Sequence, residues 1–256
     1  MEKASTLERR ARILEQVDAA GQVEIQNLSG IFRVSEVTIR NDLAQLEQKN
    51  LLLRTRGGAI KQRRVGLDFA LAEKQKQHLE EKQHIGRAAA ELIKEYDTII
   101  LDSGSTTMEI AKNLGHLNHA TVITNALNIA SILAEYKNIK VIIPGGFLRE
   151  NSYSLVGSLA EQNIRNYYCD KLFLGVDGFD SRYGISTPNI EESQLNRVMV
   201  EISREIIVVT DSSKFLRRSF AFIIPVTKID MVITDKGIPQ EEQNILKNMG
   251  VKVVIV

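Results

Sequence analysis

Two stretches of the chain carry side chains whose types and spacing suit phosphate-bearing partners. Residues 35–60 combine short polar side chains with arginines and contain the pair Gly57-Gly58. Further along, Asp102-Ser103-Gly104-Ser105-Thr106-Thr107 is a run of small, mostly hydroxyl-bearing residues. Short polar residues and arginines on a helix suit a DNA groove. A loop of small residues instead lets backbone N–H groups approach one bound anion.

The first stretch predicts a helix that reads DNA. Ser35 can cap a helix that runs to about Lys49, because its hydroxyl can accept a hydrogen bond from a backbone N–H of the first turn. Ile39, Leu43 and Leu46 share one helical face and should pack in a small core. The candidate DNA-contacting residues on and beside the other face are Ser35, Glu36, Val37, Thr38, Arg40, Asn41 and Gln45. Among them, Asn41 could read adenine and Arg40 could read guanine or bind phosphate.

A basic hairpin is expected directly after this helix. Leu51–Leu53 and Ala59–Ile60 would pair across the Gly57-Gly58 turn. Arg54 and Arg56, with Lys61, would then meet backbone phosphates or the minor groove. Arg9, Arg10 and Arg12 on the first helix are further candidates for phosphate contact. The alternative to a DNA-reading helix over residues 35–49 is a solvated amphipathic helix with ordinary surface charges.

The elements around this helix predict a winged helix-turn-helix domain over residues 1–61. Helices are expected over residues 7–20 and Ile25–Phe32, with the turn at Arg33-Val34. Residues 1–66 hold 12 basic and 8 acidic residues, whereas the whole chain has a net charge of only +1. A basic head on a mildly acidic body suits nucleic-acid contact by the head alone. Residues 62–78 are polar and charged and are interpreted as a linker that leads into a helix from Leu79 to Ile93.

Residues 79–256 are expected to form an open, doubly wound α/β domain. Continuous apolar runs are typical of parallel strands buried on both faces. The predicted strands are Thr98–Leu101, Thr121–Thr124, Lys140–Ile143, Lys171–Val176, Ile206–Thr210, Met231–Thr234 and Val251–Val256. The predicted helices between them are Thr106–Leu114, Leu127–Tyr136, Ser158–Asn166, Glu191–Arg204 and Glu241–Met249.

Loops at the carboxyl ends of these strands predict an effector pocket, because ligands of open α/β sheets bind in the crevice there. The Asp102–Thr107 loop could hold a phosphate, Lys214 and Arg149 could neutralise it, and Asp177 and Glu191 could accept sugar hydroxyls or an amino group. The candidate effector-binding residues are Asp102, Ser103, Gly104, Ser105, Thr106, Thr107, Thr124, Asn125, Gly145, Gly146, Arg149, Asp177, Glu191 and Lys214. A plain strand-to-helix turn is the alternative for the Asp102–Thr107 loop.

The chain resembles the DeoR family of bacterial transcriptional regulators. The resemblance rests on Ser35, Thr38–Leu43, Leu46, Arg54 and Gly57-Gly58-Ala59, and it continues through the second domain. Asn50 stands where glycine is usual and Arg56 where histidine or tyrosine is frequent. Within the family, Leu172–Asp177, Gly184–Thr187 and Leu195-Asn196-Arg197 look most like the repressors of N-acetylgalactosamine catabolism.

The resemblance implies a fold, a ligand class and site residues for the C-terminal domain. In the DeoR family the C-terminal domain is similar to sugar-phosphate isomerases and aminosugar-phosphate deaminases, and it senses a phosphorylated sugar. The resemblance implies that Asp102–Thr107 is the phosphate loop. It also matches Lys214 to the lysine of the family's Asp-Ser-Ser-Lys segment. A repressor of a sugar or aminosugar operon is expected, with operator DNA as its partner. A homo-oligomer is also expected, a dimer or a tetramer, because a palindromic operator matches two-fold protein symmetry.

Other classes of protein remain as alternatives. Asp177 and Glu191 keep open a sugar-phosphate isomerase or deaminase with an accessory DNA-binding head. A metal-dependent regulator is disfavoured, because His116 and His119 lie in an expected loop with no cysteine partner and His78 and His84 on a charged helix. We expect no catalytic residues, no cofactor and no metal. The sequence shows neither an apolar run of about 18 residues nor a signal segment, and Cys169 is its single cysteine. A cytoplasmic protein is therefore expected.

Overall fold

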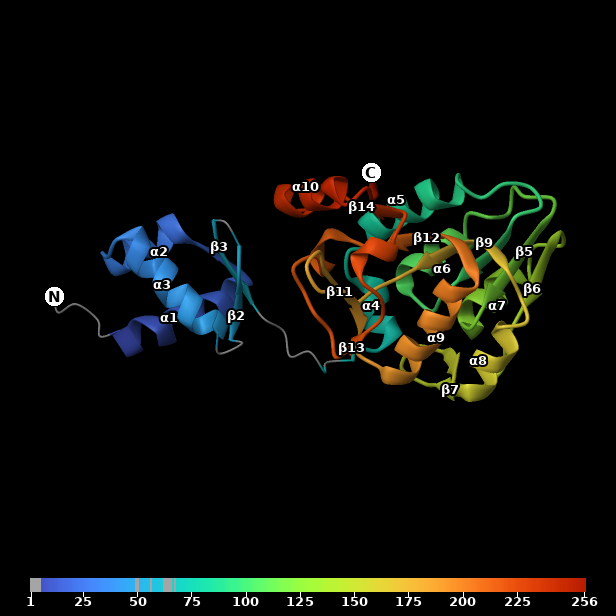
Figure 1. Ribbon diagram of the computed structural model, residues 1–256, viewed down its shortest axis with the longest axis horizontal. Coiled ribbons are helices and arrows are strands. Elements are labelled where there is room, and N and C mark those ends of the chain that lie inside the picture. The colour runs from blue at the N-terminus through green and yellow to red at the C-terminus, as the bar shows by residue number, and fades with distance from the viewer. Residues whose placement is uncertain (1–5, 49–50, 56, 62–65, 67) are drawn as a thin grey trace. The chain divides into compact units, whose positions relative to one another are not determined.

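The computed structural model describes residues 6–48, 51–55, 57–61, 66 and 68–256 of the chain (Figure 1). The chain divides into two compact units, Met1–Arg64 and Val65–Val256. The first unit is largely helical, whereas the second is built on a large parallel sheet. This division confirms the expected fold class, a helix-turn-helix head and an α/β body.

The first unit holds three helices and a three-stranded antiparallel sheet. The elements are α1 (Thr6–Ala20), β1 (Gln22–Glu24), α2 (Ile25–Phe32), α3 (Glu36–Gln48), β2 (Leu52–Arg54) and β3 (Gly58–Lys61). The strands lie in the order β1-β3-β2, and β2 and β3 form the expected hairpin. Strand β1 was not expected, because three residues are too few to show an alternating pattern.

One hydrophobic core joins the helices and the hairpin of the first unit. Helix α3 contributes Ile39, Leu43 and Leu46, none of which is more than 3% exposed, so the expected buried face is confirmed. The Ser35 hydroxyl accepts a hydrogen bond of 3.2 Å from the Thr38 N–H, which confirms the expected cap. The turn before this cap needs a left-handed residue, and Arg33 supplies it with a φ of 51°.

The second unit is built on a seven-stranded, all-parallel sheet. Its strands are β4 (Thr98–Leu101), β5 (Ala120–Thr124), β6 (Ile139–Ile142), β9 (Cys169–Leu174), β12 (Ser203–Val209), β14 (Met231–Thr234) and β15 (Lys252–Ile255). They lie in the order β15-β14-β12-β9-β4-β5-β6. The chain enters this sheet at β4 and continues through β5 to β6 at one edge. It then returns to β9, which lies on the other side of β4. The strand order therefore reverses between β4 and β9, which creates a topological switch point.

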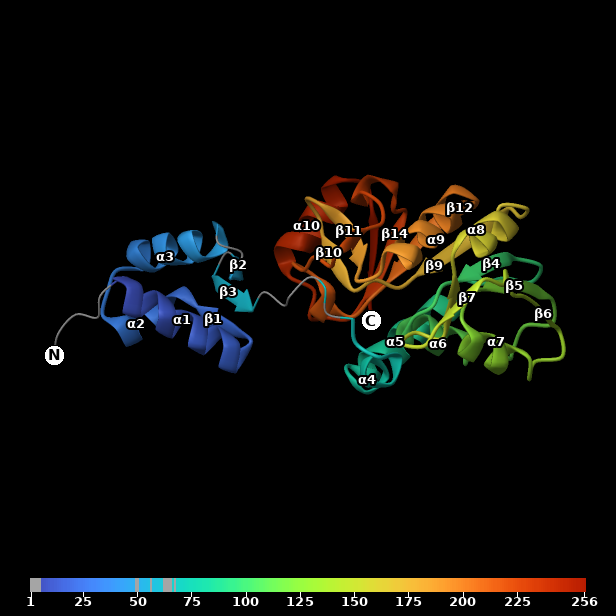
Figure 2. The same ribbon diagram turned by 90° about the horizontal axis from the view of Figure 1, so that it is seen from below.

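Helices cover both faces of this sheet (Figure 2). Helices α5 (Leu79–Ala90), α6 (Ser105–Ala111) and α7 (Leu127–Leu133) lie on one face, and α8 (Ser158–Ile164), α9 (Ile190–Glu201) and α10 (Gln240–Asn248) on the other. Along β4, Ile99 and Leu101 belong to one core and Ile100 to the other. Burial on both faces explains why the strands read as unbroken apolar runs.

Close packing of α5 on α6 depends on a glycine. A Cβ atom added at Gly86 would lie 2.6 Å from the Cβ of Glu109, closer than real side chains approach. The two helices therefore sit at a distance that a larger residue would increase. This packing matters for the site, because α6 follows the Asp102–Thr107 loop and α5 carries Lys82.

The linker predicted over residues 62–78 is corrected by the structure for its second half. Residues 71–76 form helix α4 (Leu71–Lys76), which belongs to the second unit. Leu71 is buried, and its N–H donates a hydrogen bond of 2.7 Å to the carbonyl of Asn151. This helix was missed because ion pairs and one apolar residue hold it, so its sequence shows no apolar stripe. Residues 62–65 and 67 lie outside the described residues.

Two small antiparallel sheets complete the second unit. One pairs β7 (Phe147–Arg149) with β8 (Ser154–Val156), and the other has the order β10 (Gly178–Asp180), β11 (Gly184–Thr187), β13 (Ala221–Phe222). Cys169 is buried at the start of β9, as expected of a small hydrophobe. Within the described part of the chain, no helix combines the length and the apolar character that a membrane crossing requires.

Candidate functional site

The outer face of α3 presents the side chains that were expected to contact DNA. Val37 is 66% exposed, and Arg40, Asn41 and Gln45 are exposed near it. The Arg40 guanidinium pairs with the carboxylate of Glu36, one turn earlier, at 3.0 Å. An exposed pair of this kind stabilises a helix by only about 0.3–0.5 kcal/mol. It therefore orients Arg40 without preventing a contact to a base or a phosphate.

The first turn of α3 also orders its own polar side chains. The hydroxyls of Ser35 and Thr38 lie 2.9 Å apart, while Ser35 also caps the helix. Both side chains remain at the surface of the unit at least in part. A contact from either hydroxyl to a DNA phosphate would add to the cap rather than replace it, because a hydroxyl can donate and accept at once.

The wing is anchored to α3 through Arg54. The backbone N–H of Arg54 donates a hydrogen bond of 2.9 Å to the Glu47 carboxylate, and its Nε lies 3.8 Å from the same group. The Arg54 side chain is half exposed, so it can reach a phosphate. Arg56 lies outside the described residues, and so does the side chain of Lys61.

Two arginines of α1 bind a buried carboxylate of α3. Asp42 of α3 is 2% exposed, and it accepts hydrogen bonds from Nε of Arg9 at 2.6 Å and from Nε of Arg10 at 2.8 Å. Arg9 and Arg10 therefore hold α1 against α3, and their contact with DNA phosphate stays a prediction. Arg12 is exposed on the same helix.

In the second unit, a hollow opens at the switch point of the large sheet. It lies beyond the carboxyl ends of β4, β9 and β12, where Asp102 and Gly175 follow adjacent strands. The Asp102 carboxyl accepts a hydrogen bond of 3.1 Å from the Gly175 N–H and so joins the two loops. The hollow is lined by Phe69, Leu71, Lys74, Lys82, Asp102, Ser103, Gly104, Ser105, Thr106, Asn151, Ser152, Gly175, Val176, Asp177, Thr187, Glu192, Asn196, Thr210, Asp211 and Lys214.

The Asp102–Thr107 loop forms one wall of this hollow. Ser105 and Thr106 line it and are only 8% and 6% exposed, and no hydrogen bond joins either hydroxyl to another described residue. Thr107 differs, because its hydroxyl donates to the carbonyls of Asp102 at 2.9 Å and Gly104 at 3.0 Å. Thr107 thus shapes the loop, while Ser105 and Thr106 are available to a ligand.

Three lysines from separate elements face the hollow. Lys214 follows β12, and Lys82 comes from α5, where its ammonium donates hydrogen bonds of 2.5 Å to the carbonyls of Lys74 and Gln77. Burial lowers the pKa of both Lys82 and Lys214, and repulsion from Lys74 lowers each further. A bound anion would relieve this repulsion and stabilise the charged lysines.

Lys74 is the lysine with an ion-pair partner in the hollow. Its ammonium lies 2.8 Å from the Asp177 carboxylate. Burial acts to lower the pKa of Lys74, but attraction to Asp177, with smaller contributions from Glu192 and Asp68, outweighs it and raises the pKa. Lys74 therefore stays charged around neutral pH.

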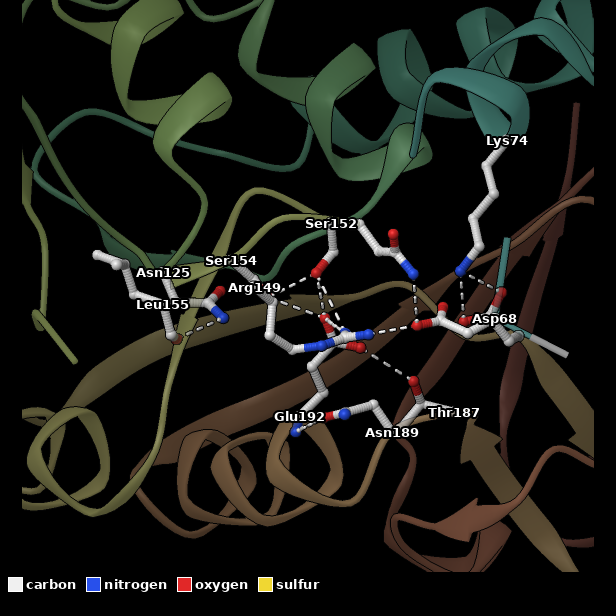
Figure 3. A network of polar contacts seen from close by, with 12 residues as sticks. Asp68, Lys74, Asn125, Arg149, Ser152, Ser154, Leu155, Thr187, Asn189 and Glu192 are labelled. Carbon is white, nitrogen blue, oxygen red and sulfur yellow. Dashed lines mark hydrogen bonds and ion pairs between the residues drawn. The ribbon is translucent and has the colours of Figure 1, made fainter. Parts of the chain in front are cut away.

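Carboxyl groups complete the lining of the hollow. Burial raises the pKa of Asp102 to about 8, so that this side chain is largely protonated at neutral pH and can donate a hydrogen bond. Glu192 pairs with Arg149 at 2.5 Å and accepts hydrogen bonds from Ser152 at 2.7 Å and Ser154 at 2.8 Å (Figure 3). These contacts hold the Glu192 carboxylate in one orientation at the edge of the hollow.

Several residues assigned to the pocket from sequence do not line the hollow. Thr124 and Asn125 are buried, and the Asn125 amide donates to the carbonyl of Leu155 at 3.3 Å. Gly145 and Gly146 form a turn with positive φ, in which a Cβ at Gly146 would lie 2.5 Å from the Val156 carbonyl oxygen. Their role is to shape the chain between β6 and β7.

Arg149 and Glu191 are likewise displaced from their assigned roles. Arg149 does not line the hollow but holds Glu192, which does. Glu191 is exposed on the outer side of α9. The carboxylate that lines the hollow belongs to the next residue, Glu192. The sequence contains a signal for the inner position, because Glu192 is spaced three and seven residues before the buried Leu195 and Met199.

Other lining residues were missed because they come from elements distant in sequence. Lys74 belongs to the unexpected helix α4, and Lys82 lies on α5, a helix rich in charged residues. Ser152 lies between the unexpected strands β7 and β8. A charged residue at a buried helical position was the available signal for Lys82, which shares a face with Ile85, Gly86 and Ala89.

The two units together define a class of protein: a winged helix-turn-helix head joined to an α/β unit with an anion-suited hollow at its switch point. Residues 9–64 match the model of the DeoR-like helix-turn-helix domain, and residues 77–236 match that of the DeoR C terminal sensor domain. The chain belongs to the DeoR family and is a DNA-binding transcriptional regulator.

Similar proteins agree with this assignment. The chain is 42% identical to a putative aga operon transcriptional repressor of Escherichia coli O157:H7, over 98% of this chain and 94% of that protein. It is 33% identical to the HTH-type transcriptional repressor GlcR of Bacillus subtilis, over 97% and 95% of the two chains. Among solved structures, it is similar to ribose 5 phosphate isomerase A from Neisseria gonorrhoeae, with 16% identity, a TM-score of 0.39 and coverage of 54% and 53%.

Proposed function

We propose that this chain represses a sugar or aminosugar catabolic operon and that a phosphorylated sugar bound in the second unit controls its affinity for the operator. The observation that carries the proposal is the convergence of Lys82, Lys214 and the hydroxyls of Ser105 and Thr106, which bind no other described residue, on one hollow. Ammonium and hydroxyl donors together suit a phosphate group. The carboxyl groups of Asp102, Asp177 and Glu192 suit the hydroxyl or amino groups of a sugar.

The operator would be bound by the outer face of α3 and by the wing. Asn41, Arg40 and Val37 would face the bases, while Ser35, Glu36, Thr38 and Gln45 would flank them and Arg54 would meet a phosphate. Two copies of the chain would bind the two halves of a palindromic site, since operator symmetry mirrors protein symmetry. The support for this arrangement is the exposure of these side chains together with the helix-turn-helix match.

Binding of phosphorylated sugars to the full-length protein tests the proposal. We expect N-acetylgalactosamine 6-phosphate or galactosamine 6-phosphate to raise the melting temperature, because a ligand that binds only the folded state stabilises it. The same sugar should change the affinity for a DNA duplex taken from upstream of the regulated operon. If no phosphorylated sugar stabilises the protein, or if the protein does not bind that duplex at low salt, the proposal is wrong.

Lys214→Ala should separate the two activities. We expect it to weaken the response to the sugar phosphate while leaving operator binding in the absence of sugar intact, because the residue lies in the second unit. Lys228→Ala is the matched control, since Lys228 is an exposed lysine of the same unit. An unchanged sugar titration in Lys214→Ala would exclude this lysine from the binding site.

We propose further that the chain binds the sugar phosphate without converting it. The relatives named above are repressors, which supports a sensor rather than an isomerase or deaminase. The carboxyl groups of Asp177 and Glu192 are engaged by Lys74 and Arg149, so neither is a free base in the ligand-free state. A multiple-turnover assay on the same sugar phosphates should show no product, and detectable turnover would favour the enzyme.

A further inference from the structure

The segment that joins the two matched domain models contributes directly to the hollow. We call residues 68–76 the connecting segment. It lies between the helix-turn-helix match, which ends at residue 64, and the sensor match, which begins at residue 77. Phe69, Leu71 and Lys74 nevertheless line the hollow. A ligand bound there would therefore touch the part of the chain that follows the DNA-binding unit.

Two ion pairs hold the connecting segment to the hollow. Near its start, Asp68 pairs with Arg149, which also holds Glu192. On α4, Lys74 pairs with Asp177 at 2.8 Å. Figure 3 shows Arg149 between Asp68 and Glu192, with Lys74 reaching in from its helix. Each pair thus joins the segment to a carboxylate or a guanidinium that belongs to the hollow or borders it.

The end of α4 is also fixed to the hollow. Lys82 is 3% exposed and donates to the carbonyls of Lys74 and Gln77, so one buried ammonium binds two carbonyls at the C-terminal end of this helix. The same ammonium lines the hollow. The Lys74 ammonium contacts Asp177, and the Lys74 carbonyl contacts Lys82. Both partners are charged side chains that line the hollow.

A phosphorylated sugar would compete for the contacts of Lys74. The Lys74 and Asp177 side chains are 20% and 24% exposed, so both can reach a molecule in the hollow. The phosphate dianion offers the lysine a second anionic partner, and a sugar hydroxyl or ammonium offers Asp177 a second donor. The Lys74–Asp177 pair therefore stabilises the position of the connecting segment most when the hollow holds no ligand.

We propose that the Lys74–Asp177 ion pair is a latch, opened by the sugar phosphate, through which binding in the hollow acts on the connecting segment and so on the DNA-binding unit. The inference rests on the proposed function and names its regulation. A ligand changes an equilibrium only by binding its two states unequally. Here the closed state keeps Lys74 on Asp177, and the open state gives Lys74 or Asp177 to the ligand.

Hydrogen–deuterium exchange of the full-length protein tests the latch directly. The probes are galactosamine 6-phosphate and, in a parallel sample, inorganic phosphate. We expect galactosamine 6-phosphate to increase exchange of the amides of residues 71–77 about fivefold, because an ion pair that water still reaches stabilises by up to about 1 kcal/mol. In Lys74→Met this exchange should be fast without the probe and unchanged by it.

The coupling between the sites provides the second measurement. It is the ratio of operator dissociation constants with and without galactosamine 6-phosphate. We expect Lys74→Met to bring this ratio, measured at saturating galactosamine 6-phosphate, about fivefold closer to one. Asp177→Asn breaks the same pair from the other side and should have the same effect on exchange. Lys76→Met, on the exposed side of the same helix, is the matched control and should behave as wild type.

The outcomes separate the latch from the proposed function. If the probe stabilises the protein and changes operator affinity, but exchange of residues 71–77 and the coupling ratio are the same in wild type and Lys74→Met, the latch is wrong and the proposed function stands. If no sugar phosphate stabilises wild type or alters its operator affinity, the proposed function fails and the latch fails with it. An equal effect of inorganic phosphate would show that the anion alone opens the latch.

Discussion

Asp42 of α3 accepts a hydrogen bond of 2.6 Å from Arg9 of α1, across 33 positions of sequence, and the carboxylate is only 2% exposed. Arg10 binds its other oxygen at 2.8 Å. A carboxylate buried between two guanidiniums fixes the angle at which the DNA-facing helix crosses the first one. The loss of this one group should therefore be felt in stability before it is felt in DNA recognition.

Asp42→Asn should destabilise the first unit strongly. Removing one partner of a buried ion pair costs about 3–5 kcal/mol, because it leaves uncompensated charge in a site with little water. Calorimetry of the full-length protein should show the transition of the first unit at a lower temperature and that of the second unit unchanged. Glu36→Gln, which breaks the exposed pair with Arg40, is the control and should cost less than about 1 kcal/mol. Equal melting curves for the two variants would contradict the structural role of Asp42.

Asn41→Ala tests base reading by α3. An asparagine that forms two hydrogen bonds to adenine discriminates by about 1–3 kcal/mol. We expect operator affinity to fall roughly tenfold or more and the preference at one base pair to relax, with folding unaffected because Asn41 is exposed. Fluorescence anisotropy with the natural duplex and with variants substituted at each base pair would measure both effects. A uniform loss across all duplexes would assign Asn41 to the DNA backbone instead.

Arg54→Ala tests phosphate contact by the wing. Binding that releases counterions depends linearly on the logarithm of salt concentration, with a slope of about −0.9 for each phosphate neutralised on duplex DNA. We expect this substitution to weaken binding to all duplexes alike and to reduce the slope by about one unit. Arg165→Ala, an exposed arginine of the second unit, should leave the slope unchanged. An unchanged slope in Arg54→Ala would place the wing away from the DNA.

The large sheet could be predicted because its signal is local. Each of its strands contains an apolar run, buried on both faces in the central strands and partly exposed in the edge strands β6 and β15. All of the expected strands occur, with their ends shifted by no more than three residues. The α3 cap was equally predictable, since Ser35 and Thr38 lie in one turn. The short strands β1, β7, β8, β10, β11 and β13 were not, because two to four residues carry no periodicity.

The hollow could be predicted only in part, because its charge balance is a tertiary property. The sequence places Asp102–Thr106 and Lys214 after strands of one sheet, so their meeting follows from the rule on strand ends. Lys74 and Lys82 come from helices that precede the sheet, and their burial depends on how α4 and α5 pack. Arg149 was predicted to bind the ligand, whereas in the structure its guanidinium pairs with Glu192 and with Asp68.

The neighbouring residues Glu191 and Glu192 provide a matched test of the pocket. Glu192→Gln should weaken binding of galactosamine 6-phosphate about tenfold or more, because a hydrogen bond to a charged group is worth about 1.5–3 kcal/mol. Glu191→Gln, one position away and exposed, should leave binding unchanged. The shift of the melting temperature with sugar concentration gives both values. If Glu191→Gln weakened binding and Glu192→Gln did not, the position of α9 in the site would be wrong.

The pH dependence of stability tests the environment of Asp102. Its pKa is about 8 in the folded protein, raised by burial, and near 3.8 in the unfolded chain. Between these values the folded state binds the extra proton, so stability falls as pH rises, by about 1.4 kcal/mol for each pH unit well inside the window. Above pH 8 the loss is complete. We therefore expect the second unit to melt at a lower temperature at pH 9 than at pH 6.

Asp102→Asn should remove this dependence, because the amide cannot ionise but can still accept the hydrogen bond from the Gly175 N–H. The difference between the two proteins should grow with pH up to about pH 8 and then stay constant, with the variant the more stable at pH 9. Glu191→Gln, which removes an exposed carboxylate, should follow wild type at every pH. A constant difference between wild type and Asp102→Asn from pH 5 to pH 9 would show that Asp102 is ionised throughout, and Asp102 could then not donate a hydrogen bond to the sugar.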